Sequence, residues 1–134
     1  MNTYARVLNG LNTSTVPTER VVSFSKIFKD TGFRFVTMSS SDLGDAIDLI
    51  YHFDKDLDLR SMRVIVPKGS AISSITSVFA CALLVENEIK EHFGVDFEGL
   101  PIDFNGTFYL DEEVQRTPFC KIGIAKKPAD AQEV

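Results

Sequence analysis

Two neighbouring stretches of this sequence alternate between apolar and polar side chains, and this pattern restricts the fold more than any other feature. In residues 46–53 every second side chain is large and apolar, and the same pattern returns in residues 59–66. A period of two residues is typical of a β-strand with one buried face. Residues 54–58 between them are acidic and indicate a hairpin turn. With a third stretch, residues 33–38, they predict a three-stranded antiparallel meander.

The segments before and after these strands in the sequence carry apolar side chains at helical spacing. The first set comprises Val21, Phe24, Ile27 and Phe28. We expect Thr15 or Thr18 to cap this helix and Gly32 to end it. Residues 74–93 predict a longer helix of about 20 residues, capped by Ser73 or Ser74 and ended by Gly94. The sequence therefore predicts a two-layer α+β domain, with helices packed on a mainly antiparallel sheet.

The length of 134 residues is that of one domain. We assign residues 15–124 to it, give residues 1–14 no definite structure, and expect residues 125–134 to be a flexible tail. Asn105-Gly106 between aromatic residues predicts a tight hairpin. The net charge of −5 argues against non-specific binding of nucleic acid. No apolar run approaches the roughly 20 residues of a membrane span, so we expect a cytoplasmic protein.

Two short patterns resemble functional motifs but lack residues that those motifs require. Residues 54–58 begin like a calcium-binding loop, but Leu59 and Ile65 stand where a Gly and a Glu are needed. We interpret this segment as a solvated turn. Residues 67–71 lack the first Gly and the spacing of a phosphate-binding loop, so they indicate a turn between a strand and a helix.

The histidines and cysteines form no pattern that indicates catalysis or metal binding. His52 shares a predicted strand face with Asp48, which we interpret as a surface pair, and His92 lies at a helix end. Cys81 and Cys120 are too few and too far apart for a thiolate metal site. Cys81 lies among apolar helix residues, which is typical of a buried, inert thiol.

Glu86 and Glu88 are the strongest candidates for a functional site. Glu86 falls on a largely apolar side of the predicted helix, where a lone carboxylate is costly to bury. Glu88 points to a different face, which excludes a pair of carboxylates sharing one proton. Two interpretations stay open. In one, Glu86 pairs with Lys90 and Glu88 is solvated; in the other, the two carboxylates hold basic groups at a protein interface.

The segment that contains these carboxylates also resembles a known family. Ser74-Ile75-Thr76, Ala82, Glu86-Asn87-Glu88-Ile89 and Phe93-Gly94-Val95-Asp96-Phe97-Glu98-Gly99, ending at Pro101, are the residues that carry the resemblance. They resemble the 30-kDa subunit family of respiratory complex I (NADH dehydrogenase) and the related membrane-bound [NiFe] hydrogenases. The family pattern is a helix with Glu-x-Glu, then an acidic residue, Phe-Gly-Ile, Phe-x-Gly and Pro. The resemblance covers roughly residues 15–120 and includes the order of helix, three strands and helix.

Two departures indicate a branch of this family. Asn87 stands where the common complex I form has Arg, and residues 99–104 read Gly-Leu-Pro-Ile-Asp-Phe instead of Gly-His-Pro-Asp-Leu-Arg. The longer C-terminal extension of the complex I subunits is also missing. Glu86-Asn87-Glu88, the short length and the ending from Tyr109-Leu110 to Pro118-Phe119 are more similar to the short subunit of energy-converting (Ech-type) hydrogenases.

The resemblance implies a non-catalytic hydrophilic subunit, peripheral to the cytoplasmic membrane. It would dock with the [NiFe] large subunit and the iron–sulfur small subunit, with no cofactor in this chain and the [NiFe] centre and clusters in those partners. The partner-binding residues implied are Glu86, Asn87, Glu88, Phe93, Gly94, Phe97, Gly99 and Pro101. If these roles apply, Glu86→Ala and Glu88→Ala leave the isolated fold largely intact and weaken assembly.

Three alternatives stay open beside this one. The first is the 30-kDa subunit of a NADH:quinone oxidoreductase. The second is a stand-alone enzyme that uses Glu86, Glu88 and His92, and the third is a small-ligand or regulatory domain with a deep, mostly apolar pocket. The sequence does not identify the electron donor or acceptor. It also leaves open whether the isolated chain forms a homodimer.

Overall fold

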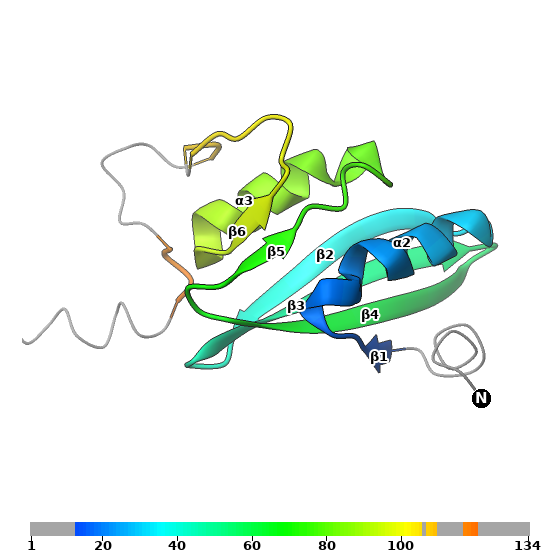
Figure 1. The fold of residues 1–134 in the computed structure, drawn as a ribbon, viewed down its shortest axis with the longest axis horizontal. Coiled ribbons are helices and arrows are strands. Elements are labelled where there is room, and N and C mark those ends of the chain that lie inside the picture. Colours follow the sequence, from blue (N-terminus) through cyan, green and yellow to red (C-terminus); the bar gives the residue numbers. More distant parts are fainter. Residues whose placement is uncertain (1–12, 106, 110–116, 121–134) are drawn as a thin grey trace, which may run out of the picture.

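The computed structural model describes residues 13–105, 107–109 and 117–120, which form an α+β fold. One sheet has the strand order β1-β4-β3-β2, with β1 Thr13–Thr15, β2 Arg34–Asp42, β3 Ala46–Lys55 and β4 Asp58–Pro67. The helices are α2 (Val21–Asp30) and α3 (Leu83–Phe93), preceded by the 3-10 turns η1 (Thr18–Arg20) and η2 (Ala80–Ala82). A separate pair joins β5 (Ala71–Ser73) to β6 (Asp96–Glu98). Figure 1 shows α2 in front of the sheet, and α3 with β5 and β6 beside β2.

The predicted meander is confirmed, and it continues further than the sequence indicated. β2 pairs with β3, and β3 with β4, in antiparallel registers that extend to the pair Lys55–Asp58. β2 runs on to Asp42, four residues beyond the stretch that was predicted, so only residues 43–45 separate it from β3. β1 begins in the segment to which we assigned no structure, residues 1–14, and pairs in parallel with β4. The sheet is therefore mixed but mainly antiparallel.

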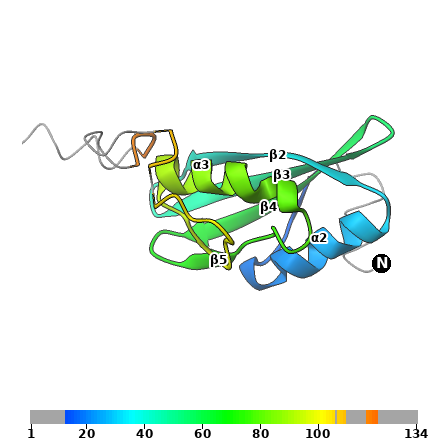
Figure 2. The same cartoon turned by 90° about the horizontal axis from the view of Figure 1, so that it is seen from above.

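The core lies between the inner face of this sheet and the helices, as Figure 2 shows from a second direction. Phe28 of α2 stacks on Phe53 of β3, with ring centroids 4.2 Å apart. The buried strand residues include Ile47, Leu49, Tyr51, Phe53, Met62, Val64 and Val66. These are the residues that alternate in the sequence, so the period-two pattern correctly predicted the inner face.

The helix α2 ends as the sequence predicted but begins differently. The Gly32 N–H donates to Lys29 O and the Phe33 N–H to Phe28 O, which is the Schellman arrangement. Gly32 has a φ of 92°, in the left-handed region that favours glycine. The predicted caps are wrong, because no side chain caps η1 or α2 and Thr15 lies in β1.

The outer face of the sheet carries polar side chains bonded to one another. His52 lies 2.8 Å from Ser39 Oγ and 2.9 Å from Ser61 Oγ. Asp48 accepts two hydrogen bonds from Arg63, at 2.8 and 2.6 Å. The predicted pairing of His52 with Asp48 is therefore wrong. Both take partners on neighbouring strands, which the spacing along one strand does not reveal.

Two further predictions concern the C-terminal third. The hairpin expected at Asn105-Gly106 is not seen, because residues 99–105 and 107–109 contain no strand. Instead, the Thr107 N–H donates to Phe104 O in a turn. The predicted tail, residues 125–134, lies outside the described residues.

Candidate functional site

The helix that carries Glu86 and Glu88 is much shorter than predicted. Residues 71–73 form strand β5, a turn follows, and α3 begins only at Leu83. Ser73 and Ser74 therefore cap no helix, and α3 has no side-chain cap at its start. Its predicted end is confirmed, because Gly94 has a φ of 78°. A Cβ added at Gly94 would lie only 2.8 Å from Thr117 Cγ2, so a close approach also requires glycine there.

Glu86 is completely buried, and its carboxylate joins α3 to the turn after β5. One oxygen accepts from Ser74 Oγ at 2.6 Å, and the other accepts from the Ile75 N–H at 2.9 Å. Ser74 Oγ also lies 2.7 Å from Thr76 Oγ1. The interpretation that Glu86 pairs with Lys90 is wrong, since these two groups satisfy the carboxylate instead.

The surroundings of Glu86 favour its neutral form. Burial raises the pKa of Glu86 to about 7, although the hydrogen bonds from Ser74 and Ile75 oppose this shift. The buried Tyr51 hydroxyl has no hydrogen-bond partner among the described residues. Its pKa is raised well above the usual value by burial, and the charge of Glu86 adds to this. When Glu86 is protonated, it can donate to Ser74 Oγ, which in turn can donate to Thr76 Oγ1.

We expect this carboxyl group to make the stability of the chain depend on pH. The folded pKa of about 7 lies above the ordinary value of 4.5, so the folded state binds more protons between these pH values. The contribution of Glu86 to the free energy of unfolding is therefore fully present below about pH 4.5. It falls by roughly 3 kcal/mol as the pH rises through about 7. Urea unfolding from pH 4 to 8 measures this loss, and Glu86→Gln removes it. Parallel curves for the two proteins would contradict the assignment.

Asn87, beside Glu86, fastens the following loop to the helix. Its Nδ2 donates to Leu83 O and to Ile102 O, each at 3.0 Å, and its Oδ1 accepts from the Phe104 N–H at 3.0 Å. Asn87 is only 2% exposed. The two departures from the common family pattern, Asn87 and residues 99–104, are therefore joined by hydrogen bonds and form one structural unit.

Two more residues of α3, Lys90 and Glu91, bind residues of the segment 103–109 that follows it in the sequence. Glu91 is buried, and its carboxylate accepts from the Tyr109 N–H at 2.8 and 3.0 Å. Lys90 Nζ lies 2.7 Å from Asp103 Oδ2, and this hydrogen bond lowers the pKa of Asp103. Glu91 was not predicted from the sequence. Its position four residues after Asn87, on the same side of the helix, was the available signal.

The eight predicted partner-binding residues divide into buried and exposed positions. Glu86, Asn87 and Phe97 are buried, Glu88 and Phe93 are half-buried, and Gly94, Gly99 and Pro101 are exposed. Glu86 and Asn87 have internal partners, so the expectation that Glu86→Ala leaves the fold intact is no longer tenable. Their role in partner binding stays a prediction.

Apolar side chains that were not selected from the sequence lie beside the exposed positions. Leu84, one turn before Glu88 in α3, is 53% exposed, and Ile102, whose carbonyl binds Asn87, is 54% exposed. We call Leu84, Glu88, Pro101 and Ile102 the α3 surface. It combines apolar groups with one carboxylate, and Asn87 binds the backbone carbonyls of Leu83 and Ile102 next to it.

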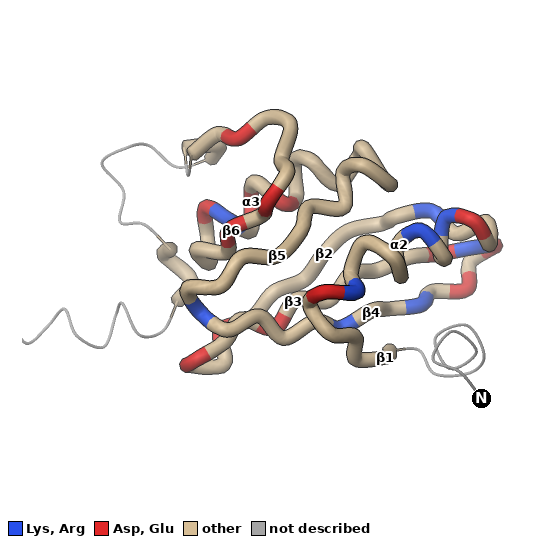
Figure 3. Tube along the Cα trace, viewed as in Figure 1, with Lys and Arg blue, Asp and Glu red and all other residues tan. Residues whose placement is uncertain are grey.

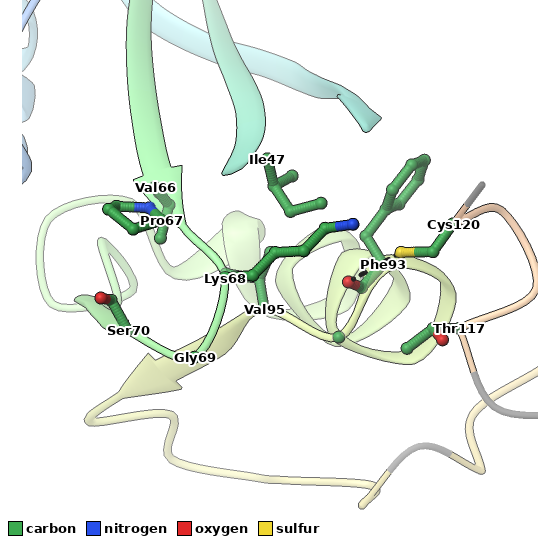
Figure 4. Close-up of a pocket in the computed structure, with 11 residues that line it drawn as sticks. Ile47, Val66, Pro67, Lys68, Gly69, Ser70, Phe93, Val95, Thr117 and Cys120 are labelled. Atoms are coloured by element: carbon green, nitrogen blue, oxygen red, sulfur yellow. Dashed lines mark hydrogen bonds between the residues drawn. The ribbon is translucent and has the colours of Figure 1, made fainter. Parts of the chain in front are cut away.

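A cavity of about 290 Å³ lies at the C-terminal end of α3. Figure 4 shows Lys68 extending across it toward Phe93, and Cys120 on the far side. Lys68 Nζ lies 2.7 Å from the buried Asp42 carboxylate, and Cys120 Sγ donates to Phe93 O at 3.4 Å. These polar groups are already engaged within the chain, so they give no support to the small-ligand hypothesis.

The cysteines and the acidic residues provide no metal site in the part of the chain that is described. No three His, Cys, Asp or Glu side chains gather there closely enough to hold a metal ion. That this chain holds no cofactor stays a prediction. The prediction for Cys81 is wrong, because Cys81 is exposed. It lies in η2 rather than in a long helix, so the helical pattern assigned it to the wrong face.

Comparison with known proteins agrees with the resemblance. The sequence profile described as respiratory-chain NADH dehydrogenase, 30 Kd subunit, matches residues 14–126. The fold is also similar to a chain in the structure of the membrane-bound sulfane sulfur reductase, an archaeal respiratory membrane complex, with a TM-score of 0.72 and 20% identity. That match covers 90% of this chain and 78% of the other. None of the helices described here is long and apolar enough to cross a membrane. The chain belongs to the respiratory-chain NADH dehydrogenase 30 Kd subunit family.

Proposed function

We propose that this chain is a non-catalytic docking subunit of a membrane-bound oxidoreductase complex. The observation that carries the proposal is the α3 surface. Leu84 and Ile102 are each about half exposed, Asn87 holds the Ile102 carbonyl to α3, and Glu88 forms no ion pair with another described residue. Protein interfaces bury apolar side chains at their centre and keep polar groups at their rim, which are the roles we assign to Leu84 with Ile102 and to Glu88. The buried bonds of Glu86 and Asn87 pre-organise this surface, so little ordering opposes binding.

The partners proposed are a [NiFe] hydrogenase-like large subunit and an iron–sulfur small subunit. The family membership supports partner subunits, and the unit formed by Asn87 and residues 99–104 supports the hydrogenase branch. The complex would lie at the cytoplasmic side of the membrane, with this chain peripheral to it. The redox centres would be in the partners, where electron transfer takes place.

A second candidate differs only in the complex that the chain joins. The similar fold is found in a membrane-bound sulfane sulfur reductase, which favours a complex that passes electrons to sulfur rather than to protons. A quinone-reducing NADH dehydrogenase is the third form of the same proposal, favoured by the family profile. Purification of the complex through a tag on this chain, followed by assays with hydrogen, polysulfide and NADH, distinguishes the three.

We predict that Glu88→Lys leaves the isolated chain folded and disrupts assembly. A half-buried side chain with no ion pair in the described part of the chain contributes little to stability, so the free energy of unfolding changes by less than about 0.5 kcal/mol. Reversal of the charge at an interface weakens co-purification of the large subunit by at least about 10-fold. Glu19→Lys, the same change at an exposed position in η1, is the matched control. Equal recovery of the large subunit with both variants would overturn the role of the α3 surface.

A further inference from the structure

A row of aromatic rings lies at the C-terminal end of α3. The ring of His92, in the last turn of the helix, has its centroid 6.1 Å from that of Tyr109 and 4.8 Å from that of Phe119. The Phe108 ring packs against Tyr109, with centroids 4.3 Å apart. Tyr109 is 63% exposed and Phe119 is 57% exposed, so much of both residues stays in water. We call His92, Phe108, Tyr109 and Phe119 the aromatic row.

The two exposed aromatic residues are held to α3 by their main chain. The Tyr109 N–H donates to both oxygens of the buried Glu91 carboxylate, at 2.8 and 3.0 Å. The Phe119 N–H donates to His92 O at 3.2 Å. Because these bonds come from the backbone, a change of side chain at position 109 or 119 leaves them in place. The rings are positioned before a partner binds, which limits the entropy lost on binding.

The aromatic row continues the α3 surface along one side of the helix. Leu84, Glu88 and His92 follow one another at intervals of four residues, so each is next to the one before on the surface of α3. The rise from Glu88 to His92 is about 6 Å. Glu88 forms no ion pair with another described residue. An unpaired carboxylate therefore lies one helical turn from the exposed rings.

The charge on this part of the chain is acidic and is not balanced. Between residues 71 and 105, Lys90 is the only Lys or Arg, whereas six residues are Asp or Glu. Lys90 is already engaged, because its Nζ lies 2.7 Å from Asp103 and 4.0 Å from Asp96. Figure 3 shows the acidic residues gathered on α3, β6 and the following loop, while the basic residues lie mainly on the sheet and α2. The acidic residues that reach the surface are Glu88, Asp96, Glu98 and Asp103.

We propose that the aromatic row binds an arginine side chain of a partner subunit, whose guanidinium stacks on the Tyr109 ring and pairs with the Glu88 carboxylate. A guanidinium is planar and weakly hydrated, so it stacks on aromatic rings more readily than an ammonium does. Arginine is also common in protein interfaces, together with the aromatic residues that it contacts. This inference rests on the proposed function, because a partner subunit supplies the arginine.

A second copy of the chain is a poor source of this arginine. Two copies that met at this surface would bring their acidic residues together. An anionic membrane would be repelled by the same carboxylates. The arginines of the described residues already have partners within the chain, namely Arg34 with Asp54, Arg60 with Asp58, Arg63 with Asp48 and Arg20 with the Phe24 ring. Arg6 and Arg116 lie outside the described residues.

The test is Tyr109→Leu in the full chain, co-expressed with the large and small subunits. Leucine keeps an apolar side chain and the backbone bond to Glu91 but has no aromatic face, so retention of the subunits should fall by at least about 5-fold. Tyr109→Phe is the matched control, because it keeps the ring and should retain both subunits. Position 109 is largely exposed, so the three isolated chains should have similar melting temperatures. Equal retention by the wild type and Tyr109→Leu would show a merely apolar contact and overturn this inference alone.

A double substitution tests whether one arginine contacts both groups. With a shared arginine, Tyr109→Leu combined with Glu88→Gln should reduce retention by less than the product of the two separate reductions. A reduction equal to that product would show that Tyr109 and Glu88 bind independently, and the shared arginine would be rejected.

Further measurements identify the source of the arginine. In NMR spectra of the isolated chain, Arg6→Gln and Arg116→Gln should leave the ring signals of Tyr109 unchanged. Displaced ring signals would show that an arginine of this chain occupies the site, and loss of a homodimer in Tyr109→Leu would identify a second copy. Either result would reject a partner subunit as the occupant. Failure of the wild-type chain to retain either subunit would overturn the proposed function and this inference with it.

Discussion

Glu86→Ala is expected to lower the free energy of unfolding of the isolated chain by about 3 to 4 kcal/mol at pH 6. The substitution removes a fully buried side chain and leaves a cavity, and it leaves the buried Ile75 N–H without an acceptor. The Ser74 hydroxyl keeps only its contacts with the Thr76 hydroxyl and the Thr76 N–H. Because small domains are stable by only about 5 to 15 kcal/mol, this is a large fraction of the total. Urea unfolding followed by circular dichroism measures it.

Two variants separate the causes of this loss. Glu86→Gln keeps the volume and one acceptor oxygen, so at pH 6 it should cost less than half as much as Glu86→Ala. Glu88→Ala, two residues along the same helix, should change the free energy of unfolding by less than about 0.5 kcal/mol. A Glu86→Ala protein as stable as Glu88→Ala would show that the Glu86 carboxylate does not hold the turn after β5.

Asn87→Ala is expected to release the loop that contains Ile102 and Phe104. It removes three hydrogen bonds from a side chain that is 2% exposed, which costs about 2 to 3 kcal/mol. The loss is mainly local, so the Phe104 amide should exchange its hydrogen roughly 30- to 150-fold faster. Hydrogen exchange followed by NMR measures this rate residue by residue.

Asn87→Asp is the matched variant for this prediction. It keeps the oxygen that accepts from the Phe104 N–H and loses the donor to Leu83 O and Ile102 O. Protection of the Phe104 amide should therefore be largely retained, while the total stability falls. Equal exchange at Phe104 in the wild type and in Asn87→Ala would show that the loop is held by other contacts.

Strands β2, β3 and β4 and the helix α2 were predictable because their signals are local. Alternation identified the inner residues of β3 and β4, and Gly32 identified the end of α2, where the positive φ needs glycine. These features depend on neighbours in the sequence. The parallel pair of β5 and β6 does not, because Ala71 lies opposite Asp96, 25 positions away. The residues of β5 were therefore interpreted as a turn that leads into a helix.

The candidate site was only partly predictable, for a related reason. The helical rule of four residues suggested Glu86 with Lys90, yet Ser74 and Ile75 satisfy Glu86, and Asp103 binds Lys90. The apolar surroundings of Glu86 were predicted correctly from the sequence. Its partner was not, because the turn after β5 returns to α3 only through the tertiary fold. A buried carboxylate without a local partner indicates a distant one.

The bonds from Asn87 to Ile102 and Phe104 have a consequence for experiments that exchange parts between family members. Placing arginine at position 87 alone would put a longer, charged side chain where a small amide donates and accepts at once. Replacing residues 99–104 alone would leave the amide facing a different backbone. A chimera should therefore carry both substitutions together, and the two single exchanges should each be less stable than the double exchange. Position 87 and residues 99–104 therefore form one structural module.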